Sequence, residues 1–270
     1  MKKFWKFFLL ALLAAVVLAA GYVAWDDTHI TLTNYDYYSD NIPEEFFGYR
    51  ILCIADYHNS YYYDQLARLI NRQMPDVLLF LGDMTLMPEC DTSYLDELLA
   101  HISNEIPMYG VTGNHESFCP NADVLVAHLR DSHIEMLHNE KILLERGDKS
   151  IALYGLADMG IADTELAGSW AIGEARTFLQ ENLSPTEFSI VACHRANAYP
   201  LLNDIPADLM LAGHLHGGII RLPIVGGLFS DEGFLPDYDA GYWKEDEMTL
   251  LVSRGCDFNW NKLRVFNGPE

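Results

Sequence analysis

Five short apolar runs recur along the chain, and each one ends in polar residues. Runs of about four to six residues rich in Val, Ile, Leu and Phe are typical of strands buried on both faces. The runs cover residues 50–55, 76–81, 108–112, 188–193 and 208–212. The residues that follow them are Asp56-Tyr57-His58, Gly82-Asp83, Gly113-Asn114-His115-Glu116, His194-Arg195 and Gly213-His214-Leu215-His216. The pattern predicts five strands, each with reactive side chains at its carboxyl end.

Helical patterns separate these runs. Apolar residues recur at helical spacing in 63–74, which Pro75 ends, and helices are also expected over 94–103, 122–130 and 172–183. Alternation of strands and helices predicts a largely parallel central sheet. The last third of the chain is richer in strand patterns, at 219–224, 248–254 and 262–267. We expect these strands to form a second sheet packed on the first rather than a separate domain.

The carboxyl ends of parallel strands lie at one edge of a sheet, where ligands collect. The predicted edge gathers five of the ten histidines with Asp56, Asp83 and Asn114. Each cluster alone is as often an ordinary turn, but five in succession favour a cation site, since such groups would otherwise remain unpaired or repel one another. Mixed imidazole and carboxylate ligands suit Mn, Fe or Zn better than Ca or Mg. The number of candidate ligands exceeds the needs of one ion and favours two.

The N-terminal segment has a different character. Lys2, Lys3 and Lys6 precede an apolar stretch over 7–25, and Asp26 and Asp27 follow it. About 19 residues at 1.5 Å each span roughly 28 Å, close to the thickness of a bilayer core. We therefore expect 1–27 to be a single-pass membrane anchor with 28–270 as the folded domain outside, because basic residues remain on the cytoplasmic side. Small residues around Ala19 leave a cleaved signal peptide open as the alternative.

Charge and cysteine content narrow the class further. The formal net charge is −22, which repels long nucleic acid, so we expect no long nucleic acid as a partner. Most of the acidity is explained by solubility, and some carboxylates would be metal ligands. The five cysteines have no repeated spacing and form no metal-binding pair. A bridge between Cys90 and Cys119 is conceivable outside the cell.

The order of the motifs adds a resemblance. D-x-H, G-D, G-N-H-E, a lone His and G-H-x-H resemble the calcineurin-like metallophosphoesterase family, from about residue 49 to the C-terminus. The segments "GHLHGGIIRLP", "LLVSRG" and "GPE" are similar to those of membrane-anchored bacterial phosphodiesterases in particular. The resemblance implies an α/β fold in which two sheets form an α/β/β/α sandwich, with two divalent metal ions (Mn, Fe or Zn) at its centre.

The resemblance also implies roles for single residues. Asp56, His58 and His216 would bind the first metal, and Asp83 would bridge both. The second metal would take the remaining ligands, which are Asn114, His194 and His214. His115 would be the catalytic residue beside the leaving oxygen, where it donates a proton or stabilises charge.

Three positions depart from the family pattern. Leu86 stands where many relatives carry an acid that supports the catalytic histidine, so His115 would depend on another group such as Glu116 or Glu89. Leu215 and Ile219 replace polar residues that commonly lie near the substrate. Arg195 follows a predicted ligand and could bind a phosphate oxygen, although a surface salt bridge is an equal alternative.

We therefore expect a binuclear metal-dependent phosphoester hydrolase. Its phosphoester substrate would be a phosphodiester or pyrophosphate, with lipid-linked or cell-envelope compounds the leading class because of the expected membrane anchor. Two alternatives stay open, namely a non-catalytic metal-binding scaffold and a phosphomonoesterase or nucleotide hydrolase that acts on soluble substrates.

Overall fold

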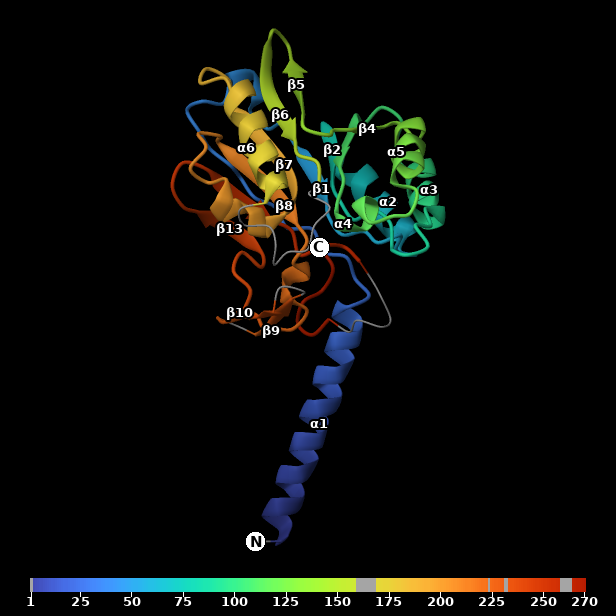
Figure 1. The fold of residues 1–270 in the computed structure, drawn as a ribbon. Helices are drawn as coiled ribbons and strands as arrows, with labels where there is room; N and C mark the ends of the chain where they lie inside the picture. Colours follow the sequence, from blue (N-terminus) through green and yellow to red (C-terminus); the bar gives the residue numbers. More distant parts are fainter. Residues whose placement is uncertain (1, 159–168, 223, 231–232, 258–263) are drawn as a thin grey trace.

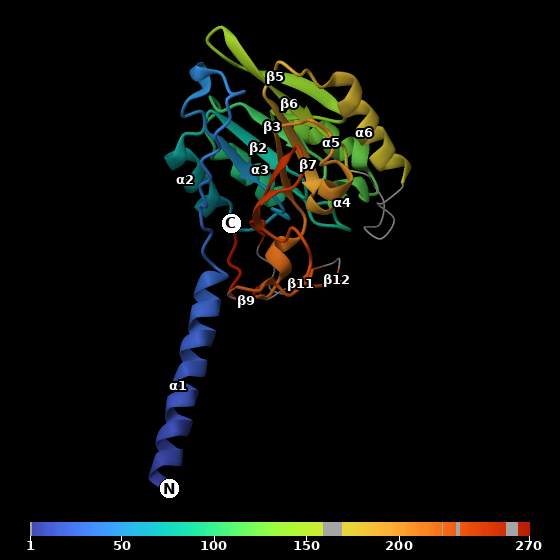
Figure 2. The same ribbon diagram turned by 90° about the vertical axis from the view of Figure 1, so that its left-hand side faces the viewer.

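The structure is a computed structural model that describes residues 2–158, 169–222, 224–230, 233–257 and 264–270 of the chain. A long N-terminal helix projects from a folded domain built on two sheets, as Figures 1 and 2 show. The helix is α1 (Lys2–Asp26), and its residues Lys3–Asp26 form a span of mean hydropathy 2.6 that is long enough to cross a membrane.

The first sheet has four parallel strands in the order β1-β2-β3-β4. Three of these strands correspond to the first three apolar runs of the sequence, and helices cover the outer face of the sheet (Figure 1). The strands are β1 (Ile51–Ile54), β2 (Val77–Leu81), β3 (Met108–Val111) and β4 (Ile134–Met136), and the helices are α2 (Tyr63–Gln73), α3 (Ser93–Ala100) and α5 (Ala122–Asp131). Apolar residues of these helices, such as Leu66 and Leu98, pack on Leu78 and Phe80 of β2.

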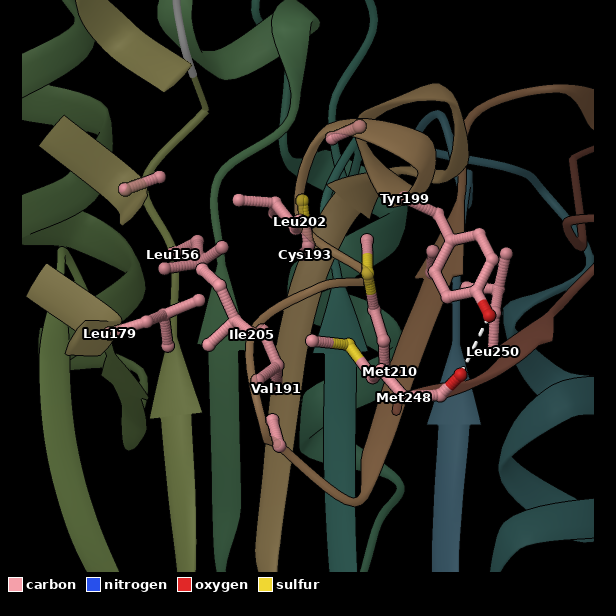
Figure 3. Packing of buried hydrophobic residues seen from close by; sticks show 14 of the residues in the cluster. Leu156, Leu179, Val191, Cys193, Tyr199, Leu202, Ile205, Met210, Met248 and Leu250 are labelled. Carbon is pink, nitrogen blue, oxygen red and sulfur yellow. Dashed lines mark hydrogen bonds between the residues drawn. The ribbon is translucent and has the colours of Figure 1, made fainter. Parts of the chain in front are cut away.

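The second sheet has six strands in the order β13-β14-β8-β7-β6-β5. Strands β6, β7, β8 and β14 run parallel, whereas β5 and β13 are antiparallel edges. The strands are β5 (Glu140–Arg146), β6 (Lys149–Gly155), β7 (Ser189–Arg195), β8 (Leu209–Gly213), β13 (Gly241–Lys244) and β14 (Thr249–Val252), and α6 (Trp170–Asn182) covers the outer face. Figure 3 shows the core on this side, where Leu179 of α6 faces Val191 and the Tyr199 hydroxyl donates to the Met248 carbonyl at 2.6 Å.

A third core lies between the two sheets. It includes Leu79 and Leu81 of β2 with Ile190 of β7 and Leu211 of β8. The molecule is therefore a mixed α/β sandwich with helices outside both sheets, as the sequence predicts.

Short elements complete the chain. They are η1 (Glu44–Phe46), α4 (Asn114–Ser117), η3 (Ala196–Leu201), η4 (His216–Gly218), β9 (Arg221–Leu222), β10 (Gly226–Gly227), β11 (Phe229–Ser230) and β12 (Gly233–Phe234). Strand β9 pairs with β10, and β11 pairs with β12, as two small antiparallel pairs.

Two details of the predicted topology were wrong. The five predicted strands do not share one sheet, because β1, β2 and β3 lie in the first sheet and β7 and β8 in the second. The C-terminal strands do not make a second sheet by themselves either. Only β14 and its partner β13 join it, while the pattern over 219–224 yields the two-residue strand β9. Of the pattern over 262–267, the described residues 264–267 form an isolated bridge between Val265 and Ile220 rather than a strand.

Candidate metal centre

The carboxyl ends of both sheets meet, and there the seven predicted ligands come together. Asp56 and Asp83 lie two residues beyond β1 and β2, Asn114 begins α4 after β3, and His194 lies within β7. Three groups have ligand atoms within 4.8 Å of one another: Asp56, His58 and His216; His58, Asp83 and His115; Asp83, His194 and His214. Asn114 joins the third group, since its Oδ1 lies 3.1 Å from Nε2 of His194.

The backbone at this edge is held in unusual conformations. Five of the predicted ligands have positive φ, with values of 51° at Asp56, 47° at His58, 52° at Asp83, 80° at His214 and 49° at His216. Each such residue costs about 1–3 kcal/mol, although Asp and His tolerate the region better than most. Strain concentrated on one set of side chains indicates that their convergence serves function rather than stability.

Glycine permits the closest approach in the site. A Cβ at Gly113 would collide with Oδ1 of Asp83, and one at Gly82, where φ is 87°, would lie 2.7 Å from Nδ1 of His194. The glycines of the G-D and G-N-H-E motifs therefore leave room for these neighbouring polar side chains.

Three histidines share one hydrogen-bonding pattern. Nδ1 of His58 lies 3.2 Å from the Thr85 carbonyl, Nδ1 of His194 lies 2.8 Å from the Leu81 carbonyl, and Nδ1 of His216 lies 3.2 Å from Oδ1 of Asp257. Carbonyl and carboxylate oxygens only accept, so each Nδ1 carries the proton. In the neutral ring the lone pair is then on Nε2, which faces the carboxylates at the centre. This is the arrangement of metal-binding histidines, whose other nitrogen donates to a nearby oxygen.

In the group of Asp83, His194, His214 and Asn114, this tautomer of His194 places no hydrogen atom between the ligand atoms. Nε2 of His194 faces Oδ1 of Asn114 at 3.1 Å and Oδ2 of Asp83 at 3.4 Å, so three acceptors converge. A cation between them would satisfy all three acceptors, and the donor set of imidazole, amide and carboxylate suits a divalent metal. Without a metal the cation is a proton: burial opposes charge on His194, but attraction and a hydrogen bond from Asp83 outweigh it and raise the pKa of His194 to about 10.

His115 has the opposite tautomer. Its Nδ1 accepts the backbone N–H of Met87 at 2.9 Å, so the neutral ring carries its proton on Nε2, which lies 3.9 Å from Oδ2 of Asp83. Burial, only partly offset by Asp83, lowers the pKa of His115 to about 4. Met87 therefore orients this ring, one residue beyond Leu86, and neither Glu116 nor Glu89 has that role among the described contacts.

Glu116 instead fixes the backbone of the site, a role that the sequence did not reveal. Its buried carboxylate accepts the N–H groups of Asp83 and Gly113 at 2.8 Å and that of Thr85 at 3.0 Å. Burial and the adjacent Asp83 raise the pKa of Glu116 to about 7. It thereby ties the loop after β2 to the loop after β3.

Asp257 is a second residue that sequence reasoning missed. It is buried, it accepts from Nδ1 of His216, and its Oδ1 lies 3.3 Å from Nη1 of Arg264. Burial would raise the pKa of Asp257, but His216 and Arg264 outweigh it and hold the pKa well below the usual range. No motif marks this position.

Arg195 lies in a buried ion pair rather than on the surface. Its Nε lies 2.7 Å from Oδ1 of Asp158, and the side chains are 2% and 0% exposed. The salt bridge that the sequence allowed is present, in a buried setting. A contact between Arg195 and phosphate stays a prediction.

The bridge that the sequence allowed between Cys90 and Cys119 is also present, with Cα atoms 6.2 Å apart. It joins the loop after β2 to the segment after α4. Cys53, Cys193 and Cys256 are free.

The fold and the site point to a class of protein, and comparisons with known proteins establish that class. The model of the calcineurin-like phosphoesterase family matches residues 49–218, which is more than half of the chain. This protein therefore belongs to the calcineurin-like phosphoesterase family of metal-dependent hydrolases. The family prediction and the expected enzyme class are confirmed.

Relatives extend over most of the chain. YkuE, an uncharacterized metallophosphoesterase of Bacillus subtilis, is 26% identical over 96% of this chain and 91% of its own length. The phosphodiesterase YaeI of Escherichia coli is 27% identical over 82% of this chain and 80% of its own. The UDP-2,3-diacylglucosamine pyrophosphatase LpxG of Chlamydia muridarum is 23% identical over 94% and 93%. The NAD nucleotidase NadN of Haemophilus influenzae shares the fold, with a TM-score of 0.50 and 15% identity over 77% of this chain and 45% of its own.

Proposed function

We propose that this protein hydrolyses phosphodiesters or pyrophosphates with two divalent cations, Mn, Fe or Zn, held by the seven ligands. Asp56, His58 and His216 would hold one cation, and Asn114, His194 and His214 the other. Asp83 would bind both, since it belongs with His58 on one side and with His194 on the other. The observation that carries the proposal is the contrast of tautomers, in which three histidines offer Nε2 lone pairs and His115 offers an Nε2 proton.

Each residue then has a defined task. When bound, two divalent cations lower the pKa of a shared water and stabilise the charge that develops on phosphoryl oxygens. The Thr85, Leu81 and Asp257 oxygens keep the ligand rings in the tautomer that binds metal. The neutral ring of His115 would donate a hydrogen bond from Nε2 to the leaving oxygen and so stabilise the charge that develops there, and the Met87 N–H keeps that ring in place. Arg195, held by Asp158, would approach a phosphate oxygen.

We infer that residues 1–27 are a membrane anchor and that 28–270 form the catalytic domain outside the cytoplasm. The apolar helix is preceded by three lysines, which favours a cytoplasmic N-terminus. The disulfide between Cys90 and Cys119 supports an oxidising compartment for the domain. A cleaved signal peptide would also place the domain outside the cytoplasm, but it would leave the domain without a membrane anchor.

The substrate class follows from the setting and the relatives. A site next to a membrane would act on lipid-linked or cell-envelope phosphoesters, and LpxG, named for a diacylated sugar nucleotide, supports the lipid-linked class. The acidic domain argues against long nucleic acid as a partner.

Two phosphoesters of different leaving-group quality test the role of His115. We expect His115→Ala to lower kcat about 10²–10³-fold on an alkyl phosphodiester, whose leaving oxygen develops strong negative charge. The loss on bis-p-nitrophenyl phosphate should be much smaller, because p-nitrophenolate spreads that charge over its ring without a hydrogen bond. Equal losses on both substrates would rule out this role for His115.

Loss of the shared carboxylate tests catalysis itself. Asp83→Asn keeps the side chain's size but removes its charge, so Mn-dependent turnover of bis-p-nitrophenyl phosphate should fall to background. Turnover of p-nitrophenyl phosphate alone in the unaltered protein would identify a phosphomonoesterase. No metal-dependent turnover of either compound would favour the non-catalytic scaffold.

A further inference from the structure

The domain carries an exposed apolar surface near the candidate metal centre. It lies on the short strands β9 to β12 and is called here the β9–β12 surface. Its members are Leu222, Ile224, Val225, Phe229, Phe234 and Leu235. Ile224 is fully exposed and Phe234 is 65% exposed. The ring centroids of Phe229 and Phe234 lie 5.2 Å apart. So many large exposed apolar side chains in one short segment mark an interaction site.

The surface lies at the end of the domain from which α1 projects. Figures 1 and 2, taken at right angles, both place β9 and its neighbours level with the C-terminal end of α1. Tyr22 and Trp25 at that end of α1 are 48% and 53% exposed, and such aromatic residues mark the boundary between lipid and water. The β9–β12 surface therefore lies at the height of the membrane surface when α1 spans the bilayer.

Contacts between the end of α1 and the domain hold α1 level with the β9–β12 surface. The Tyr22 ring stacks on Phe266 at 5.8 Å, and the Thr31 N–H donates to the Pro269 carbonyl at 2.8 Å. The C-terminal segment that provides both partners also contains Arg264, the neighbour of Asp257. The end of the helix is thus tied to the segment that supports His216.

The β9–β12 surface is also continuous with the site. Strands β10 and β11 contact η4, which begins with His216. A Cβ at Gly218 would lie 2.6 Å from the Cα of Gly227, so the two backbones meet directly. The apolar side chains are therefore carried on the same packed unit as a proposed ligand.

The scarcity of charged side chains on the β9–β12 surface indicates which kind of partner it binds. Between Ile219 and Leu235 the described residues include one charged side chain, Arg221, and it is paired with Asp239 at 2.9 Å. The sequence places Asp231 and Glu232 in the same segment, outside the described residues. The surface thus offers apolar area and no described free cation, which suits insertion into neutral lipid rather than attraction to anionic headgroups.

We propose that the β9–β12 surface inserts into the outer face of the bilayer that α1 spans and places the metal centre at headgroup level. The substrate class is then an amphiphilic phosphoester whose apolar part stays in the membrane while its phosphorus reaches the site. This consequence rests on the proposed function and membrane anchor, whereas the insertion itself does not depend on catalysis.

Lipid quenching tests the insertion without any activity measurement. The full chain with Ile224→Cys carries an environment-sensitive dye in phosphatidylcholine nanodiscs that contain doxyl-labelled lipid. The matched control is Asp148→Cys, in the exposed turn between β5 and β6 at the opposite end of the domain (Figure 1). The unaltered chain, whose free cysteines are Cys53, Cys193 and Cys256, gives the labelling background.

We expect doxyl lipid to quench the dye at position 224 by about twofold or more and to leave the dye at position 148 unchanged, since only an inserted group meets the acyl region. The proposal would be overturned if doxyl lipid left the fluorescence unchanged at both positions. A blue-shifted dye at 224 that doxyl lipid does not quench would overturn it too, because the surface would then pack on a second copy or another protein.

Substrate selectivity provides the second measurement. Ile224→Asp combined with Phe234→Asp should lower turnover of a vesicle-borne phosphodiester by about tenfold or more and leave bis-p-nitrophenyl phosphate unaffected, because a charge opposes insertion. Leu143→Asp, an exposed change on β5, is the control and should affect neither. Equal loss on both substrates would contradict the proposal. If the unaltered chain hydrolyses neither compound, the proposed function fails while the quenching result still decides the insertion.

Discussion

At the scale of single residues, the hydrogen-bond partner at Nδ1 determines what each of four histidines can do. The ligand rings donate from Nδ1 to the Thr85 and Leu81 carbonyls and to Asp257, whereas His115 accepts at Nδ1 from the Met87 N–H. Residues of the same type, within one centre, are thereby divided into candidate ligands and a candidate hydrogen-bond donor.

Asp257 should matter for metal affinity although it touches no metal. Asp257→Asn weakens the acceptor that orients His216, so we expect the Kd for Mn²⁺ to rise about 10- to 100-fold. Calorimetric titration of the full chain in detergent measures it, with Asp148→Asn as the control for an exposed carboxylate. An unchanged Kd at an unchanged melting temperature would remove Asp257 from the site.

Metal binding should also release protons. In the metal-free protein His194 is charged below a pKa of about 10, and a cation must displace that proton. The apparent Kd should therefore rise about tenfold for each unit that pH falls from 8 to 6, for each proton displaced. Titrations in buffers of different ionisation enthalpy count the protons, and a Kd independent of pH would contradict the assignment of His194.

The candidate ligands could be identified from the sequence because each one follows closely on an apolar strand, which is a local signal. Asp257 could not, since it reaches His216 from 41 residues further along the chain with no motif around it. Glu116 was visible in G-N-H-E, but its contacts with Asp83 and Thr85 join loops more than 30 residues apart, and only the fold reveals them.

At the scale of elements, the strands could be located but not assigned to sheets. All residues of β2 and of β7 are buried, and a strand buried on both faces has the same apolar pattern in either sheet. The long connection through β4, β5 and β6 moves the chain from one sheet to the other. The candidate ligands nevertheless converge, because the carboxyl ends of both sets of strands meet.

The disulfide should stabilise the two loops around His115. Closing a loop with a sequence separation of 29 contributes about 3.5 kcal/mol in the chain-entropy account. The double change Cys90→Ser with Cys119→Ser should therefore lower the free energy of unfolding in urea by about 3.5 kcal/mol. Dithiothreitol should have the same effect on the unaltered protein and none on the double variant. If the reductant does not alter the unaltered protein, the bridge is absent.

At the scale of the whole molecule, one apolar helix and one exposed apolar surface lie at the same end of an acidic domain. His216 of the candidate metal centre begins η4, which contacts β10 and β11 of that surface, whereas the hairpin of β5 and β6 lies at the opposite end of the domain (Figure 1). This arrangement predicts that the domain rests on the outer face of the bilayer that α1 spans, with its candidate metal centre directed toward the lipid.

Labelling in intact cells tests the orientation. Asp148→Cys should react with a membrane-impermeant maleimide without permeabilisation, because the β5–β6 turn would lie outside the cytoplasm. The unaltered chain, whose free cysteines are the half-buried Cys53 and the buried Cys193 and Cys256, sets the background. Reaction only after the membrane is permeabilised would reverse the proposed topology.

The central claim is that seven side chains hold two cations that share Asp83. Anomalous diffraction from crystals grown with Mn²⁺ tests it most directly. We expect two peaks about 3.5–4 Å apart, one beside Asp56 and His216 and the other beside Asn114 and His194, with Asp83 touching both. A single peak, or two peaks that do not share Asp83, would contradict it.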